Sequence, residues 1–108
     1  MAWRTPVEGG KLMSPHTVEL PFVWNNLDAS RGLVGYGPEL QAMATRMSRM
    51  WAAFARAGDP NIPGHLRWER YTPQNRGTMV FDVHDRLVRD PHKAEREVLS
   101  TVPPGPFG

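Results

Sequence analysis

The amino-acid sequence predicts an α/β chain with one long amphipathic helix, one or two short strands, a short final helix and much loop. Apolar residues recur every three or four positions over residues 38–57, which is the period of a helix with one buried face. A short β-branched run at residues 78–83 is typical of a strand. The 11 Pro and 10 Gly among 108 residues require long stretches of irregular backbone.

The elements before the long helix are expected to be short. Residues 1–6 alternate loosely and stop at a proline, as the end of a strand does. Residues 7–15 hold two glycines between flanking prolines, which predicts a loop that leads to His16. Residues 19–25 form either a short helical turn or an apolar segment tucked into a core, because so short a run has no decisive period. Four glycines or prolines predict a surface loop over residues 26–38.

The helix over residues 38–57 is the clearest element of the sequence. Pro38 suits its first position, where a missing N–H costs nothing. The negative charge of Glu39 is stabilising near the N-terminus, which is the positive end of the helix dipole. Gly58 is a natural residue just past the end, and Pro60 forbids continuation. The apolar stripe is expected to be core, and it consists of Leu40, Met43, Met47, Met50, Trp51 and Phe54. Arg46, Arg49 and Arg56 fall mostly on the other side.

The second half of the chain carries the strands. Residues 66–71 alternate apolar and charged side chains, and they either form a brief strand or only lay their aromatic residues on a neighbour. The strand at residues 78–83 has a possible hairpin partner at residues 87–89. A charged helix is expected from residue 90 to about residue 99, and residues 103–108 form a Pro/Gly-rich, extended tail.

Composition and charge exclude several classes of function. The 13 basic and 11 acidic residues are interspersed and leave a formal charge of only +2, whereas a nucleic-acid-binding domain usually concentrates its cations. The absence of cysteine rules out disulfides and thiolate zinc sites. No apolar run approaches the roughly 20 residues that a membrane-spanning helix needs. Since no apolar signal core is present either, we expect a bacterial cytoplasmic location and no membrane partner.

One histidine stands in a turn ahead of a compact apolar run. Taken alone, His16 could be a general base, a metal ligand or a buried, hydrogen-bonded imidazole, and the last of these is the commonest role of an arbitrary histidine. The remaining histidines have no ligand-like spacing and lie in polar segments that we expect to be exposed: His65, His84 and His92. No metal site is therefore predicted. The only serines are Ser14, Ser30, Ser48 and Ser100, and none lies in a G-x-S-x-G elbow.

The run from His16 to Trp24 resembles the catalytic-histidine segment of type-B carboxylesterases, the group that includes bacterial para-nitrobenzyl esterases and cholinesterases. That segment reads His, a small residue, any residue, Glu, Leu or Ile, any residue, Phe, Val and an aromatic. The similarity continues at residues 50–61, which resemble the family's W-x-x-F-A-x-x-G-x-P helix end. Trp68 and Tyr71 fit its W-x-x-Y, and residues 78–81 and 90–91 its last strand and helix. The departures are Thr17, where cholinesterase-like members have Gly, and Trp24, where Phe is common.

This resemblance implies an α/β-hydrolase fold to which residues 1–102 contribute the C-terminal portion. Because triad residues follow in the order Ser, Asp or Glu, His in such enzymes, the serine, the acid and the oxyanion-hole glycines would precede residue 1. The resemblance assigns His16 as the catalytic general base of a serine carboxylic-ester hydrolase that needs no cofactor. It assigns Glu19 a supporting role, anchoring the loop through a buried hydrogen bond; a second acid–base group is the alternative for Glu19. Leu20, Phe22 and Trp24 are expected to be core residues.

Two functional hypotheses remain. In the first, the chain is a C-terminal fragment of an ester hydrolase, and its partner is the N-terminal part of the same hydrolase. Such a fragment could come from a truncated or split reading frame or from a cut gene. Because residues 1–4 look like a family strand, we expect a start codon inside an older gene. Alone, such a fragment should be inactive. In the second, the chain is a non-catalytic remnant that binds a protein partner, or itself, through exposed apolar surface.

Overall fold

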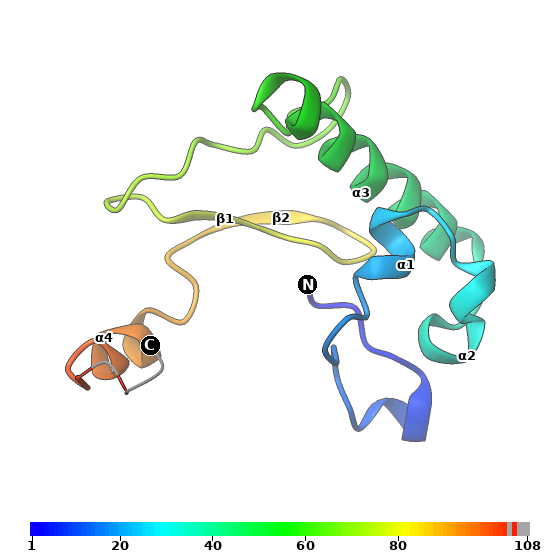
Figure 1. Ribbon diagram of the computed structural model, residues 1–108, viewed down its shortest axis with the longest axis horizontal. Coiled ribbons are helices and arrows are strands. Elements are labelled where there is room, and N and C mark those ends of the chain that lie inside the picture. Colours follow the sequence, from blue (N-terminus) through cyan, green and yellow to red (C-terminus); the bar gives the residue numbers. More distant parts are fainter. Residues whose placement is uncertain (104, 106–108) are drawn as a thin grey trace.

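The computed structural model describes residues 1–103 and 105 and shows a helical layer over a two-stranded hairpin (Figure 1). Its helical elements are η1 (Val7–Gly10), α1 (Leu20–Val23), η2 (Asp28–Ser30), α2 (Arg31–Val34), α3 (Pro38–Ala57) and α4 (Lys93–Leu99). Its strands are β1 (Gly77–Val80) and β2 (Arg86–Arg89). The helices α1, α2 and α3 gather on one side of the molecule, whereas α4 lies at the far end.

The long helix α3 begins and ends where the sequence predicts. Pro38 occupies its first turn, and Gly58 adopts a left-handed conformation with φ of 69° just past its end. The N–H of Gly58 donates to the carbonyl of Phe54 at 2.7 Å, which satisfies one of the carbonyls that a helix end leaves free. One face is buried, through Leu40, Met43, Ala44, Met47 and Met50. The predicted core stripe is therefore confirmed for four of its six residues, those from Leu40 to Met50.

The short helix α1 packs against α3 and settles the ambiguity over residues 19–25 in favour of a helical turn. Phe22 is fully buried, but Leu20 is 45% exposed and Trp24 is 75% exposed. The prediction that all three are core residues is wrong for Leu20 and Trp24. Residues four apart share a helix face, and a residue two positions away points to the other side.

The two strands form an antiparallel hairpin in which Gly77 pairs with Arg89 and Val80 with Arg86. The hairpin partner predicted at residues 87–89 is confirmed. The first strand stops at Val80, short of the predicted end, because the chain then folds into a turn in which Asp85 accepts a hydrogen bond from the N–H of Asp82 at 3.1 Å. Phe81 follows the strand and is 5% exposed.

Three ring systems form an aromatic cluster between α3 and the hairpin. The ring of Phe81 lies 5.6 Å from that of Trp51 and 5.7 Å from that of Trp68, in tilted and edge-to-face arrangements. Such pairs contribute about 0.5–1.5 kcal/mol beyond their buried area. Residues 66–71 have no regular structure, so the interpretation that they lay an aromatic side chain on a neighbour is confirmed for Trp68.

Other boundaries differ from the predictions. The predicted strand at residues 1–6 is not formed. The N–H of Ala2 donates to the carbonyl of Phe81 at 2.7 Å, but no ladder of hydrogen bonds continues from this contact. The loop predicted over residues 26–38 contains η2 and α2. The final helix begins at Lys93 rather than at residue 90. Of the predicted tail, residues 104 and 106–108 lie outside the described residues.

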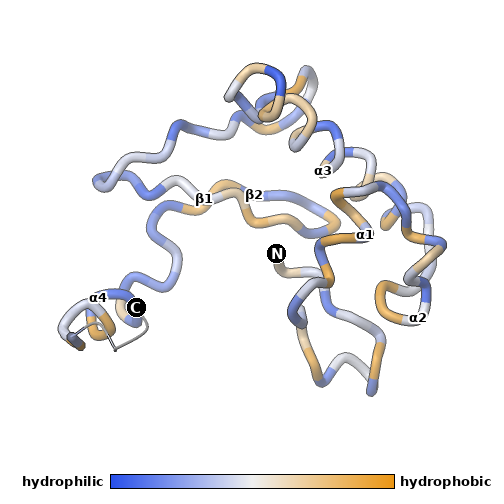
Figure 2. The backbone as a smooth tube through the Cα atoms, viewed as in Figure 1, coloured by the Kyte–Doolittle hydropathy of each residue, from blue (hydrophilic) through white to orange (hydrophobic). Residues whose placement is uncertain are grey.

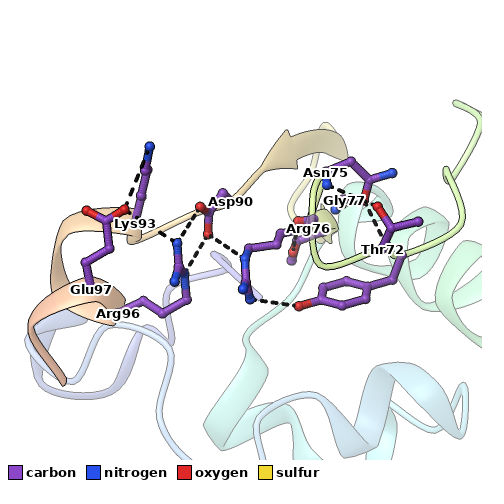
Figure 3. A network of polar contacts seen from close by, with 10 residues as sticks. Thr72, Asn75, Arg76, Gly77, Asp90, Lys93, Arg96 and Glu97 are labelled. Atoms are coloured by element: carbon purple, nitrogen blue, oxygen red, sulfur yellow. Dashed lines mark hydrogen bonds and ion pairs between the residues drawn. The ribbon is translucent and has the colours of Figure 1, made fainter. Parts of the chain in front are cut away.

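The final helix is joined to the hairpin by charged side chains (Figure 3). Arg96 donates two hydrogen bonds to the carboxylate of Asp90, at 2.9 and 2.7 Å. These bonds hold the pKa of Asp90 below its ordinary value, because they stabilise the charged carboxylate. Arg76 lies 3.8 Å from the same carboxylate and donates to the hydroxyl of Tyr71 at 3.1 Å. The position of α4 therefore depends on an ionised Asp90.

The molecule is more open than a self-contained domain of its size. Its radius of gyration is 15.8 Å, whereas a compact domain of this length has about 13 Å. Its accessible surface is 7718 Å², whereas a monomer of this mass exposes about 6,100 Å². Apolar segments lie on separate elements joined by hydrophilic connections (Figure 2).

Part of the excess surface is apolar. Trp51 and Phe54, both predicted to be core, are 44% and 58% exposed, so that prediction is wrong for the last turns of α3. No helix within residues 1–103 and 105 is long and apolar enough to cross a membrane.

Candidate functional site

The loop that carries His16 is a series of tight turns fixed to α1. The N–H of Val18 donates to the carbonyl of Pro15 at 3.2 Å, and that of Leu20 donates to the carbonyl of Thr17 at 3.1 Å. Leu20 then opens α1, which is held against α3 by the buried Phe22. Local hydrogen bonds and core packing together present His16 at the surface, where it is exposed.

The residue after His16 has an unusual backbone conformation. Thr17 has φ of 69°, in the left-handed region that β-branched residues rarely adopt. Its hydroxyl donates to the carbonyl of His16 at 2.6 Å, which partly offsets the cost. Glycine adopts this conformation freely. The geometry therefore explains why glycine suits this position, where the resemblance places it in cholinesterase-like proteins.

No serine or carboxylate in the described part of the chain is bonded to the ring of His16. Among residues 1–103 and 105, its ring makes no hydrogen bond or ion pair with a serine or a carboxylate. Ser100, for example, donates instead to the carbonyl of Glu97 at 2.7 Å. An imidazole without a hydroxyl to deprotonate and without an acid to orient it is one of the three groups that nucleophilic catalysis by a triad needs.

Glu19 directly precedes α1 and is half-buried. Its carbonyl accepts hydrogen bonds from the N–H groups of Phe22 at 3.1 Å and Val23 at 2.9 Å. Its side chain makes no hydrogen bond or ion pair to any residue that the structure describes, so the expected buried bond is not formed within this part of the chain. The supporting role of the Glu19 carboxylate stays a prediction.

A shallow groove of about 310 Å³ lies directly beside the histidine loop. It is lined by Thr17, Leu20, Pro21, Trp24, Asn26, Ala29, Ser30 and Leu33. On the other side of His16 in the sequence, Leu12 and Met13 are half exposed. Exposed apolar side chains therefore lie on both sides of His16 in the sequence, and we name the groove and these two residues the histidine face.

A larger groove of about 770 Å³ lies at the end of α3, between that helix and residues 67–71. Its walls include the exposed rings of Trp51, Phe54 and Tyr71, with Arg67 and Glu69 among its charged residues. We name it the aromatic groove.

The sequence analysis missed a second histidine with a carboxylate partner. The side chain of His65 is only 12% exposed, and its Nε2 lies 2.9 Å from Oδ2 of Asp85, so the expectation that His65 is exposed is wrong. Arg46 donates to the same carboxylate at 3.1 Å. No spacing in the sequence signals these contacts, because Asp85 lies 20 residues from His65 and 39 from Arg46.

Within the part of the chain that the structure describes, this cluster forms neither a catalytic dyad with a serine nor a metal site. Arg46 occupies the carboxylate of Asp85, and no serine hydroxyl of the described residues is bonded to His65. In residues 1–103 and 105, no three His, Asp or Glu side chains come together as possible ligands of a metal ion.

Comparison with known proteins identifies the family. The sequence model of the carboxylesterase family matches residues 2–99, nearly the whole chain. The chain belongs to the carboxylesterase family. It is 28% identical over 86 residues to the para-nitrobenzyl esterase of Bacillus subtilis, covering 78% of this chain and 17% of that enzyme. It is 37% identical over 103 residues to the phenmedipham hydrolase of Pseudarthrobacter oxydans, covering 91% of this chain and 21% of that enzyme.

Solved structures agree with this assignment. The Geobacillus stearothermophilus carboxylesterase EST55 matches 80% of this chain with a TM-score of 0.69 and 37% identity, over 19% of its own length. The fold is therefore a portion of the α/β-hydrolase fold of these carboxylesterases. The chain spans about a fifth of the length of the curated relatives that it matches.

Proposed function

We propose that this chain is the C-terminal part of a serine carboxylic-ester hydrolase and that His16 is its catalytic general base. The observation that carries the proposal is the position of His16: exposed, on a hydrogen-bonded turn directly ahead of α1, within the segment that resembles the family's catalytic histidine. A base must be fixed in place and open to the group that it deprotonates.

In the complete enzyme, a serine from the N-terminal part attacks the carbonyl carbon of the ester while one ring nitrogen of His16 takes the hydroxyl proton. The resulting imidazolium returns this proton to the departing alcohol, which leaves an acyl-serine. His16 then takes a proton from water as the water oxygen attacks the acyl carbon, and it returns this proton to the serine oxygen when the acid is released. An Asp or Glu of the N-terminal part holds the other ring nitrogen. Glu19 fixes the turn ahead of α1 and takes no proton.

The N-terminal part of the hydrolase is the proposed partner, with residues 1–102 belonging to the shared domain. The excess of accessible surface, roughly a quarter above that of a compact monomer, is as large as a typical protein interface, which buries about 1,200–2,000 Å² in total. Part of it is the histidine face, where Leu20 and Trp24 are exposed beside His16. We therefore expect the isolated chain to be inactive on esters and prone to self-association. The proposal includes a cytoplasmic location, which cell fractionation tests.

A chimera tests the assignment of His16. Residues 1–102 replace the matching segment of the Bacillus subtilis para-nitrobenzyl esterase, and hydrolysis of para-nitrophenyl acetate is measured. The chimera should be active, and His16→Ala should lower kcat by roughly 10³-fold or more, as removal of a triad member does. His84→Ala is the matched control, because His84 is also exposed and should leave the rate unchanged. A chimera that stays active after His16→Ala would contradict the assignment. The isolated chain should hydrolyse the ester no faster than its own His16→Ala variant.

A non-catalytic interaction module is the second candidate function. Two observations favour it, namely the lack of a G-x-S-x-G serine in the chain and the exposed apolar walls of the aromatic groove. Genomic DNA directly upstream separates the two candidates. A reading frame there with a G-x-S-x-G motif supports the hydrolase, and its absence supports the interaction module.

A further inference from the structure

The backbone of His16 is held by the side chain of the residue that follows it. The hydroxyl of Thr17 donates to the carbonyl of His16 at 2.6 Å. Among the described residues, the N–H and the carbonyl of His16 make no other hydrogen bond. The neighbouring turns are closed through other groups, because the N–H of Val18 donates to the carbonyl of Pro15 and that of Leu20 to the carbonyl of Thr17. The Thr17 hydroxyl is therefore the one described contact on the backbone of His16 itself.

The conformation of Thr17 makes this contact important. Of the described non-glycine residues with positive φ, Thr17 alone is β-branched. A β-branched residue in the left-handed region is strained, and such strain persists only where the surroundings hold it. Val18, the next residue, is 1% exposed and anchors one side of Thr17 in the core. On the side of His16, the described hold is the hydroxyl bond. Glycine needs no such bond, because it adopts this conformation freely.

We propose that Thr17 is a positioning residue whose hydroxyl holds the turn that presents His16. The inference rests on the proposed function, in which His16 is the general base. The bond closes a small ring that contains the N–Cα bond of Thr17, so it restricts rotation about φ, the torsion that carries the strain. The Cα of His16 lies in the adjoining peptide plane, and its place relative to the anchored Val18 is therefore set by this torsion. Thr17 acts on catalysis through the imidazole and takes no part in proton transfer.

A small displacement of the base is enough to slow the reaction. A misplacement of about 1 Å can lower a rate by about 10²-fold, because the base must reach the proton at hydrogen-bond distance. Without the hydroxyl, a β-branched residue at this position can leave the strained conformation and move His16 with it. The loss should appear in kcat. KM should change little on Thr17→Val, because valine keeps the bulk of a side chain that lines the groove of the histidine face.

Backbone chemical shifts and couplings of the 108-residue chain test the hold on His16 without a catalytic assay, because they report φ at position 17. The wild-type chain and Thr17→Ser, which keeps the hydroxyl, should have a left-handed residue there. Thr17→Val keeps the β-branch but removes the hydroxyl, and it should leave that region. Thr45→Val is the matched control, because the Thr45 hydroxyl also donates to a carbonyl, that of Gln41 at 2.9 Å. A left-handed residue 17 that persists in Thr17→Val overturns the proposal.

Kinetics of the chimera with the Bacillus subtilis esterase test the effect on catalysis. Thr17→Val should lower kcat for para-nitrophenyl acetate by about tenfold or more, and KM should stay within about twofold. Thr17→Ser should retain most of the wild-type kcat, and Thr45→Val should leave both constants unchanged. The values are compared at equal concentrations of folded protein, so that a purely structural role, which lowers only the folded fraction, does not move kcat.

The failure of this inference and that of the proposed function are distinguishable. If His16→Ala leaves the chimera active, the proposed function fails and the role of Thr17 fails with it. If His16→Ala abolishes activity and Thr17→Val matches the wild-type kcat, the role of Thr17 alone is overturned. A rise in KM at unchanged kcat overturns it as well, because the hydroxyl then contacts the ester and does not hold the turn.

Discussion

Phe22→Ala distinguishes the residues of α1 that stabilise the fold from those that face outward. Phe22 is fully buried against α3, whereas Leu20, two residues earlier, is 45% exposed. Replacing a buried Phe by Ala costs about 3–5 kcal/mol of unfolding free energy through lost burial and the cavity left behind. Substitution of an exposed side chain usually costs about 0.5 kcal/mol or less.

The cost is large against the stability of the whole chain. A domain of this size has an unfolding free energy of about 5–15 kcal/mol, and the open shape of this molecule favours the lower end. With a urea dependence of about 1–3 kcal/mol per molar, Phe22→Ala should lower the urea midpoint by about 2 M or abolish the transition. Leu20→Ala should leave the midpoint nearly unchanged.

Far-UV circular dichroism in urea measures both variants of the isolated chain. The reverse ranking is expected for assembly. In the chimera with the Bacillus subtilis esterase, Leu20→Ala should weaken activity, because Leu20 lines the histidine face, which we propose the N-terminal part covers. Equal urea midpoints for Phe22→Ala and Leu20→Ala would refute the distinction between core and outward-facing residues of α1.

Two further predictions concern backbone conformation and pH. Thr17→Gly should raise the unfolding free energy by up to about 1 kcal/mol in thermal melts. The substitution removes a β-branched residue from a left-handed conformation, and the greater chain entropy of glycine offsets part of the gain. A clear loss of stability would contradict the inference that Thr17 is strained. Asp90 has a lowered pKa, so the stability that it contributes is present above its ordinary value near 3.9 and is lost as the pH falls further. The protection factors of the α4 amides, which compare observed with intrinsic exchange at each pH, should therefore fall below that pH, and Asp90→Asn should show the low protection at pH 6. High protection in the variant would show that Arg96 does not anchor the helix through this carboxylate.

Features set by neighbouring residues could be predicted from the sequence. The limits of α3 follow from Pro38 at its start and from Gly58 and Pro60 at its end, which act through their own backbone geometry. The hairpin follows from the β-branched run and its turn. The position of His16 in a turn ahead of a compact apolar run could also be predicted, because it depends only on the order of residues along the chain.

Features set by distant residues could not be predicted. The contacts of Asp85 with His65 and Arg46 join residues far apart in the sequence, and nothing in their local surroundings indicates them. The exposure of Trp51 and Trp24 was missed for a different reason. Periodicity shows which side chains are apolar on a helix, but it does not show whether this chain supplies the surface that covers them.

The same division between local and distant determinants applies to the proposed catalytic base. The place of His16 depends on the turns of residues 15–20 and on the packing of Phe22, all within this chain. The tautomer of His16 does not depend on these residues alone. In the proposed mechanism, one ring nitrogen accepts the serine proton while the other donates to a carboxylate. Among the described residues no carboxylate is bonded to that ring. These residues can therefore set where the imidazole stands, while under the proposed function the orientation of the ring and the nitrogen that carries its proton would depend on the acid of the N-terminal part.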